Sequence, residues 1–479
     1  MERQTKTLII LFLIAFLIRV GFIFVSPIKI WDEAVYANLG YDLSHNPFDY
    51  SVANNGWSDF IPSGGEYGWP KMGFRAPLLP YILMLFYFLK LDVLIPFFMP
   101  FIGALNVCFV YFLGKELFNE KVSLYSAILF SLIPLHVIYS AKILTDVLFT
   151  FFAVLTFLCF WKGYEKGEKR YKILFGLFLA LTLLSRYTAL WLMPVFLVYL
   201  LIKNKSFEFL KDKYLWYGAL TFFAIILPWF IYGYFAYNNP LGPFIHGIIA
   251  SGYWGGTQPP TFFFEYWLPM FSLTGFALLI AIAYILYKRE FLKRNICLLL
   301  LWFLIFLGVA ICMPHKEDRF VLAVAPPIAL LSGYFIEKIK RKEKIILATL
   351  IIASTLSLGL QFYTNYNFYY TDSNECFLKS MKFLEGVERK SVIVTDESAV
   401  VYFYTRLETK FYPSPWSYET LKGWMKDYYA GRELYVLIGD FVRPEEKYNQ
   451  IKTDLDSKAQ KVFECRNERG YSAVYKIIQ

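Results

Sequence analysis

Two adjacent carboxylates, Asp32 and Glu33, lie in the segment WDEAVYANLG (31–40), soon after an apolar run long enough to cross a membrane. Carboxylates are costly inside a bilayer unless they face water or a partner. At the mouth of a membrane cavity, a carboxylate can take a proton from a hydroxyl nucleophile or hold a divalent metal ion. A third acid, Asp146, begins a later apolar run. The structural alternative for Asp32 and Asp146 is an N-terminal helix cap, which uses the same residue type.

Basic residues that could bind a phosphate occur in several separate segments. Arginine suits phosphate because its planar fork can bond two oxygens at once. The structural alternative for each is snorkelling to lipid phosphates, but several cations that face one cavity would favour a lipid-linked phosphate ester as ligand. The candidate phosphate-binding and donor-binding residues are Lys71, Arg75, Arg186, His315, Lys316 and Arg319.

The composition indicates a polytopic membrane protein. Of the 479 residues, 57% are hydrophobic and 20% are aromatic, which is too apolar for a soluble enzyme. Many apolar runs approach the ~20 residues that span a bilayer. The net charge of +10 lies mainly in short loops between these runs, so we do not expect a nucleic-acid partner.

The positions of basic loops decide the topology, because such loops stay on the cytoplasmic side. They share one side with the N-terminus only if run 77–91 does not span, and if run 171–202 folds as two short spans with a turn near Ser185 and Arg186. We therefore predict about eleven spans, with 77–91 at the outer interface. The basic loops are 114–121, 162–172, 203–213, 287–295 and 337–344, and the predicted spans are 8–26, 93–113, 122–140, 147–161, the two halves of 171–202, 214–236, 267–287, 295–312, 320–336 and 345–362.

The sequence predicts a transmembrane domain over 1–362 and a soluble extracytoplasmic α/β domain over 363–479. Within the first, 27–92 is the first external loop, where Val35, Leu39 and Leu43 predict an amphipathic interfacial helix from Trp31. In the second, we predict strands at 391–396 and 433–439, helices at 417–431 and 443–457, and paired strands at the end. Whether Cys376 and Cys465 form a disulfide stays open.

Several motifs occur in the order and topology of a known family. They are WDEAVYANLGYDL after the first span, then FRAPLLPYI, AKILTDVLF, LLSRYTALWLMP and EDRFVLAVAPPIAL. In this respect residues 1–340 resemble the GT-C superfamily of membrane glycosyltransferases, which use polyprenyl-phosphate sugars. The protein O-mannosyltransferases and the lipid A aminoarabinose transferase are the most similar branches. The resemblance implies the GT-C fold, a polyprenyl (dolichyl) phosphate sugar donor and an active site on the extracytoplasmic face of the cell membrane.

The resemblance also implies roles for the acids. Asp32 matches the acid of the first loop, which acts as a base on the acceptor or helps to hold a metal. Glu33 matches its partner, and Asp146 matches the acid of the second loop. The implied catalytic set is thus Asp32, Glu33 and Asp146. Asp32 and Asp146 are also the candidate ligands for a divalent metal ion.

The implied roles of the cations are less uniform. Arg75 stands near a lysine that precedes a proline in the family, but the spacing differs, so either Arg75 or Lys71 could touch phosphate. Arg186 replaces a residue that is often lysine. Lys316 and Arg319 match a basic loop before a late span.

The implied reaction is a single inverting displacement at the anomeric carbon of the sugar. The phosphate leaves readily, so cations that stabilise its developing charge suffice. The acceptor could be a protein, lipid or glycan, and we expect no nucleotide cofactor, since the DxD pattern at 454–456 lies in a predicted helix of the tail. The rival hypothesis is a transporter or flippase for a lipid-linked or anionic substrate, which would place charged sites near the bilayer midplane.

Overall fold

The computed structural model of the chain describes residues 2–26, 31–52, 71–253, 257–369, 372–411, 417–440, 449–468 and 470–478. The chain divides into two compact units. We call Met1–Phe24, Gly73–Leu79 and Leu91–Phe362 the bundle unit, and Val25–Met72, Pro80–Lys90 and Tyr363–Gln479 the tail unit. The tail unit thus takes most of the predicted first external loop together with the predicted C-terminal domain.

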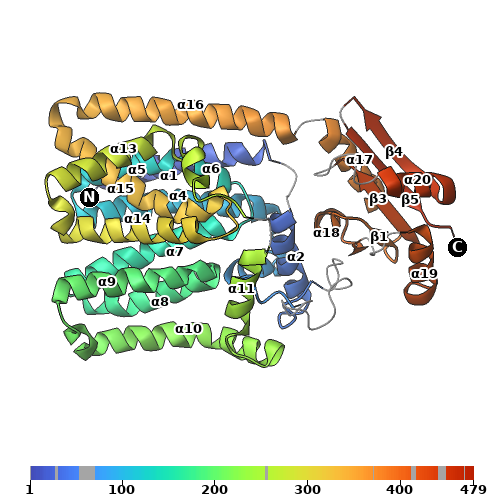
Figure 1. Cartoon of the computed structure of the whole chain (residues 1–479), viewed down its shortest axis with the longest axis horizontal. Coiled ribbons are helices and arrows are strands. Elements are labelled where there is room, and N and C mark those ends of the chain that lie inside the picture. Colours follow the sequence, from blue (N-terminus) through green and yellow to red (C-terminus); the bar gives the residue numbers. More distant parts are fainter. Residues whose placement is uncertain are drawn as a thin grey trace. The chain divides into compact units, whose positions relative to one another are not determined.

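Long helices that run alongside one another build the bundle unit (Figure 1). Its α-helices are α1 Glu2–Ile23, α4 Ile95–Leu117, α5 Glu120–Ser131, α6 Pro134–Tyr139, α7 Thr145–Phe160, α8 Lys169–Ser185, α9 Leu192–Asn204, α10 Lys213–Tyr237, α11 Gly242–Tyr253, α12 Phe262–Glu265, α13 Trp267–Tyr287, α14 Arg294–Cys312, α15 Ala325–Ile339 and α16 Glu343–Tyr369. Shorter helical turns are η3 Asp92–Leu94, η4 Trp161–Glu165, η5 Tyr187–Trp191, η6 Glu208–Lys211, η7 Glu290–Leu292, η8 Asp318–Val324 and η9 Lys340–Lys342. Helix α3, Leu78–Phe88, begins in the bundle unit and continues in the tail unit, and so does α16, from Tyr363 on.

The helices confirm a multi-pass membrane protein. Among the described residues, eight helical segments are long and apolar enough to cross a membrane, and one of them, Asp318–Phe368, contains two of the predicted spans. Two further predicted spans correspond to shorter helices, α5 with 12 residues and α8 with 17. The predicted span 122–140 breaks at Pro134, which starts α6, because proline cannot continue the preceding helix.

The two uncertain apolar runs fold as the charge argument requires. Run 171–202 forms α8 and α9, which are separated by Arg186 in extended backbone (φ −161°, ψ 130°) and by the turn η5. Run 77–91 forms only the 11-residue helix α3, about half the length that a span needs.

Ion pairs join the five basic loops to one another at one end of the bundle. Glu165 binds Lys203 (2.7 Å) and Arg294 (3.0 Å), and so connects loop 162–172 to loops 203–213 and 287–295. Loop 114–121 reaches loop 162–172 through Glu116 and Lys162 (3.4 Å), loop 337–344 through Lys121 and Glu343 (2.6 Å), and the N-terminal helix through Lys115 and Gln4 (3.0 Å). The predicted clustering of these loops beside the N-terminus is therefore present in the structure.

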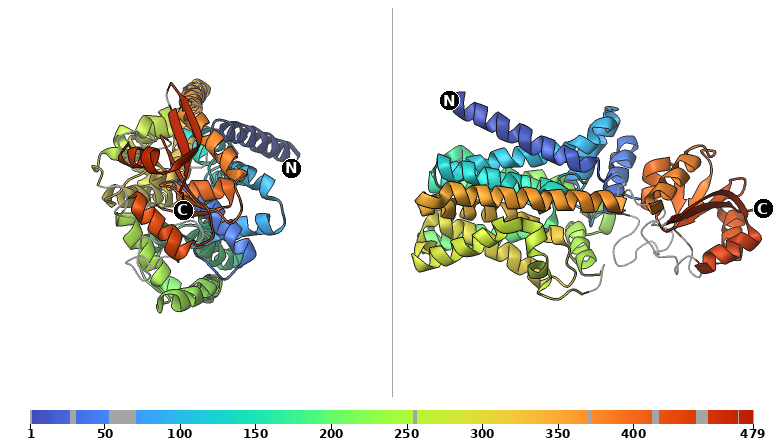
Figure 2. Two further views of the ribbon diagram at one scale, coloured as in Figure 1. Left: turned by 90° about the vertical axis from the view of Figure 1, so that its right-hand side faces the viewer. Right: turned by 90° about the horizontal axis from the view of Figure 1, so that it is seen from above.

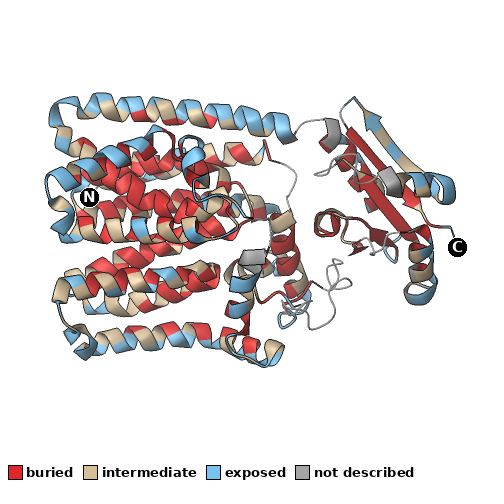
Figure 3. Ribbon diagram, viewed as in Figure 1, coloured by how far each residue is buried: buried red, intermediate tan, exposed pale blue. Residues whose placement is uncertain are grey.

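The core of the bundle lies along α4, α5, α7 and α15 (Figure 3). Helix α16 runs along the outside of the bundle (Figure 2, right) and is mostly exposed or half-buried (Figure 3). One helix pair packs unusually closely. A Cβ atom added at Gly176 of α8 would lie 1.9 Å from the carbonyl oxygen of Gly218 of α10. A pair of glycines allows this approach, as is common where membrane helices meet.

A mixed sheet of five strands forms the centre of the tail unit, in the order β2-β1-β3-β5-β4. Strand β1 is parallel to β2 and β3, and β5 is antiparallel to β3 and β4. The elements are α2 Trp31–His45, α17 Asp372–Glu385, β1 Val392–Val394, α18 Ser398–Thr405, β2 Glu408–Lys410, α19 Tyr418–Tyr428, β3 Leu434–Gly439, α20 Asn449–Lys458, β4 Gln460–Asn467 and β5 Gly470–Lys476. The predicted strands and helices of the tail are present, although part of the predicted helix 443–457 lies outside the described residues.

Two features of the tail unit extend the prediction from sequence. Cys376 of α17 and Cys465 of β4 form a disulfide. Helix α2 begins at Trp31 as predicted, but its burial is not confined to one stripe. Asn38, which does not belong to the apolar stripe of Val35, Leu39 and Leu43, is fully buried.

Replacement of Gly176 by alanine should destabilise the bundle unit, because the new methyl group would force α8 away from α10. Overpacking of this kind costs about 1–3 kcal/mol. We expect a lower temperature of thermal unfolding for the Gly176→Ala protein in detergent. The matched control is Gly308→Ala in α14, where an added Cβ meets nothing within 4 Å. An equal stability of the two variants would contradict the close packing.

Thiol labelling should distinguish two classes of cysteine. The chain has six cysteines, and Cys108, Cys159, Cys297 and Cys312 are free thiols. Denatured but unreduced protein should therefore take up one alkylating label at each of these four, by mass spectrometry, and at Cys376 and Cys465 only after reduction. Removal of the disulfide by paired serine substitutions should destabilise the tail by about 2–5 kcal/mol. Complete labelling without reduction would refute the bond.

Candidate active site

Asp146 and Arg186 form a partly buried ion pair within the bundle unit, between Oδ1 and Nη1. Asp146 lies in the first turn of α7, where the helix dipole favours a negative charge. The N-cap residue of this helix is Leu144, so Asp146 does not cap it, contrary to the structural alternative. Arg186 reaches the pair from the break between α8 and η5, and its side chain is 20% exposed, against 3% for Asp146. The break in run 171–202 thus brings a guanidinium to a carboxylate.

A second arginine comes from the turn η8. The guanidinium carbons of Arg186 and Arg319 lie 5.0 and 5.9 Å from the centroid of the Phe320 ring, so both contribute cation–π contacts to it. Arg319 also pairs with Glu317 (Nε to Oε2, 2.7 Å). The hydroxyl of Tyr139 in α6 donates to Asp318 (2.5 Å), which fixes the start of this turn. Arg186 and Arg319, two of the predicted cations, therefore lie on the same aromatic ring.

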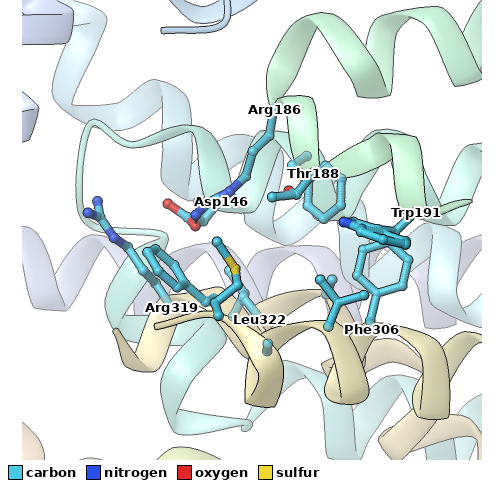
Figure 4. A pocket seen from close by; sticks show the side chains of 13 residues that line it. Asp146, Arg186, Thr188, Trp191, Phe306, Arg319 and Leu322 are labelled. Atoms are coloured by element: carbon cyan, nitrogen blue, oxygen red, sulfur yellow. Dashed lines mark hydrogen bonds and ion pairs between the residues drawn. The ribbon is translucent and has the colours of Figure 1, made fainter. Parts of the chain in front are cut away.

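These charges lie at one side of a pocket with apolar walls (Figure 4). The pocket contains about 410 Å³ of empty space, counted out to its open mouth. Trp191 and Phe306 lie together on the side away from Asp146 and Arg319, and Thr188 adds a hydroxyl beside Arg186. The remaining lining residues are Phe149, Val309, Ala310, Met313, Phe320, Leu322 and Ala323. An anionic head attached to an apolar tail matches this division of polar and apolar surface.

The other predicted cations of the same loop have different surroundings. Lys316 is 4% exposed, and its ammonium donates to the carbonyl oxygens of Gln258 (2.9 Å) and Met313 (2.6 Å). It therefore joins loop 313–318 to residue 258. His315 contacts Glu317 (Nε2 to Oε1, 3.1 Å). Neither residue lines the pocket in the described structure.

Tyr187 is a positioning group that the sequence did not single out. It directly follows Arg186, and its hydroxyl donates to the carbonyl oxygen of Gly73 (2.6 Å) and accepts from Nε1 of Trp229 in α10 (2.9 Å). The segment that carries Arg75 is thereby held beside the turn that carries Arg186. A tyrosine next to an arginine in an apolar run has no distinctive pattern, so no sequence signal could have identified it.

The remaining predicted residues belong to the tail unit. Asp32 and Glu33 lie in the first turn of α2, and Glu33 is 1% exposed. Lys71 is exposed in a short antiparallel bridge with Ser51. The structure thus brings together Asp146, Arg186 and Arg319 of the predicted set, and the joint action of Asp32 and Glu33 with them stays a prediction.

The described residues do not fit a divalent metal site. Within the described ranges, no group of three or more His, Cys, Asp or Glu side chains is close enough to hold an ion. In addition, Asp146 already bonds to Arg186. We therefore derive no chemical step through a metal.

Comparisons with known proteins point to one group. Residues 74–232 match the family described as dolichyl-phosphate-mannose-protein mannosyltransferase. This range includes Arg75, Asp146 and Arg186. No curated protein sequence matches the chain.

The fold matches two kinds of solved structure. ArnT from Cupriavidus metallidurans, in a crystal structure bound to undecaprenyl phosphate, aligns with a TM-score of 0.71 at 11% identity, over 97% of each chain. The archaeal oligosaccharyltransferase AglB from Archaeoglobus fulgidus, in complex with an inhibitory peptide and a dolichol-phosphate, aligns with a TM-score of 0.57 at 14% identity, over 90% of this chain and 69% of that one. Another structure of the Archaeoglobus enzyme, with zinc and sulfate, gives a TM-score of 0.60 at 16% identity, over 89% of this chain and 67% of that one.

The identities are too low for the structural matches to show more than the fold. The family match is evidence of a different kind from the structural matches, because it rests on the sequence of the segment that contains Asp146 and Arg186. Taken together with the shared fold and the many spans, it supports the resemblance seen in the motifs. The chain thus shares the fold of ArnT and AglB, and its residues 74–232 match the dolichyl-phosphate-mannose-protein mannosyltransferase family.

Proposed function

We propose that the protein transfers a sugar from a polyprenyl phosphate donor to a hydroxyl or amine of a protein, lipid or glycan acceptor. The observation that carries this proposal is the Asp146–Arg186 ion pair at the charged side of an apolar-walled pocket, with Arg319 nearby. Undecaprenyl phosphate and dolichol-phosphate occur in the structures of ArnT and AglB, and the proposal extends this lipid class to the present chain.

The pocket supplies what the leaving group needs. As the bond from the anomeric carbon to the phosphate oxygen breaks, both of its electrons go to that oxygen. Donors already in place stabilise this charge without reorganisation. A guanidinium carries five N–H donors, and Arg186 engages Asp146 through Nη1. The phosphate is a good leaving group once its charge is stabilised, so the step needs no general acid.

The acceptor side requires a base. An oxygen or nitrogen of the acceptor forms the new bond to the anomeric carbon, on the face opposite the phosphate, and its proton moves to a carboxylate. We assign this role to Asp32, on the resemblance of its segment to the acid of the first loop, with Glu33 as its partner. One displacement of this kind inverts the anomeric centre.

The same proposal includes an orientation. The positive-inside rule supports a cytoplasmic position for the end of the bundle with the five basic loops and the N-terminus. The Cys376–Cys465 disulfide favours an oxidising compartment for the tail unit, since such bonds are rare in the cytosol. Both observations support a protein of the cell membrane whose tail unit lies outside the cytoplasm.

Replacement of Arg186 by glutamine should weaken the binding of undecaprenyl phosphate. A hydrogen bond to a charged group contributes about 1.5–3 kcal/mol, so we expect ~10- to 100-fold weaker binding. Ligand-induced thermal stabilisation in detergent measures this. Arg186→Lys keeps the positive charge, so its binding shows whether the loss in Arg186→Gln comes from the missing cation or from misfolding. The control is Arg170→Gln in a basic loop, where the side chain is 74% exposed. Equal affinity of Arg186→Gln and wild type would refute the phosphate role.

Replacement of Asp32 by asparagine should abolish most sugar transfer and leave binding of the lipid donor intact. Loss of a general base typically lowers kcat by about 10²–10⁴-fold. The assay is release of undecaprenyl phosphate from mannosyl and aminoarabinosyl donors in native membranes, which supply the acceptor, read by mass spectrometry.

The matched control is Asp49→Asn, an exposed acid of the same external segment. Undiminished transfer by Asp32→Asn would refute the role of Asp32 as base. Donor binding without transfer by the wild-type protein, together with movement of the intact donor across vesicles, would favour the transporter instead.

A further inference from the structure

We propose that Arg406 of the tail unit is a positioning residue that sets the orientation of α2, and through it the direction of Asp32 and Glu33. This inference rests on the proposed function only for the role of Asp32. The contacts themselves lie entirely within the tail unit.

Arg406 holds α2 and α3 together at one point. Its Nη1 donates to Oδ1 of Asn38 in α2 (2.9 Å), and its Nη2 donates to the hydroxyl of Tyr87 in α3 (3.3 Å). The guanidinium carbon also lies 4.1 Å from the centroid of the Tyr41 ring. Arg406 follows the last turn of α18 in a left-handed conformation (φ 54°), where a cation is favoured by the helix dipole.

Further contacts from α18 fix the same face of α2. The side-chain amide of Asn38 donates to the carbonyl oxygen of Ala399 (2.8 Å), and the hydroxyl of Tyr402 donates to Oδ1 of Asp42 (2.6 Å). Asn38 and Asp42 are one helical turn apart and therefore lie on one side of α2. Burial, and then the Asp42 carboxylate, raise the pKa of Tyr402, so the phenol keeps its donor proton throughout the physiological range.

Contacts of α2 with α3 and with Phe411 also restrict its movement. A Cβ at Gly40 would lie 2.6 Å from Cβ of Leu83 in α3, so the two helices touch at their backbones. The ring of Trp31, at the start of α2, meets the ring of Phe411 of the tail edge-on, at 6.3 Å between centroids. Helix α2 is thus held at its beginning and along its second half.

Directional bonds of this kind set rotation as well as position. Apolar packing alone lets a helix turn about its axis at small cost, whereas the planar guanidinium of Arg406 bonds Asn38 of α2 and Tyr87 of α3 in fixed directions. An α-helix is stiff over two turns, so fixing Asn38 also fixes where Asp32 and Glu33 point. A displacement of about 1 Å in a catalytic group can cost ~10²-fold in rate.

The test compares Arg406→Ala, Arg406→Lys and Asn38→Ala with a matched control, Arg432→Ala. Arg432 is an arginine of the same unit that pairs with Glu408 (2.7 Å) and does not contact α2 in the described structure. Hydrogen exchange of residues 31–45 should become faster in the Arg406 and Asn38 variants, with exchange of β4 and β5 unchanged. Arg432→Ala should leave the exchange of α2 as in wild type.

The kinetic measurement uses the same two donors, mannose and aminoarabinose linked to undecaprenyl phosphate. Arg406→Ala should lower kcat about tenfold or more, with the KM for the donor nearly unchanged. Arg406→Lys should recover part of this loss. In combination with Asp32→Asn, Arg406→Ala should cause no further loss, because both act on one group.

Two results would overturn the inference. One is unchanged exchange of α2 in Arg406→Ala; the other is a kcat loss that multiplies in full on top of Asp32→Asn. If Asp32→Asn alone keeps full activity, the proposed base is refuted, and the exchange measurement still decides whether Arg406 positions α2.

Discussion

The partly buried ion pair of Asp146 and Arg186 is the interaction on which the architecture of the bundle unit depends. A guanidinium inside a membrane bundle is costly without a partner, and so is a carboxylate. Each can be there because the other is present. Two structural devices bring them together. The start of α7 presents Asp146 in its first turn, and the break between α8 and α9 frees Arg186 from a helix that would otherwise continue past it. A single straight helix over 171–202 could not place Arg186 at such a break.

Much of this was predictable, because the rules concerned act locally. Hydropathy identifies the apolar helices. Placing all the basic loops on the cytoplasmic side then requires that run 171–202 divide near Arg186 and that run 77–91 not span the membrane. The helix end after Ser185, the 11-residue α3 and the ion pairs that join the basic loops agree with that argument. The strands of the tail followed from short apolar runs bounded by polar ones.

Other parts of the site depend on contacts between residues far apart in the chain, which no local pattern specifies. Lys316 looks like a phosphate ligand in the sequence, but its ammonium bonds two backbone carbonyls. Tyr187 looks like an ordinary apolar residue, but it joins the Arg75 segment to α10. Helix α2 shows an apolar stripe, but its polar Asn38 is buried because Arg406 and Ala399, more than 350 residues later, satisfy its amide.

The pairing of cations with carboxylates also bears on how the proposed reaction could turn over. The sugar-linked lipid phosphate is a diester with one negative charge, and the released lipid phosphate is a monoester that can carry two. Cations therefore stabilise the transition state and the product more than the substrate, which accelerates the chemical step. Unpaired arginines would also hold the product tightly and slow its release. Asp146 beside Arg186 and Glu317 beside Arg319 reduce the net positive charge of the site. In the proposed reaction, the carboxylates that pair with these half-buried arginines would thus limit how strongly the site retains the spent lipid.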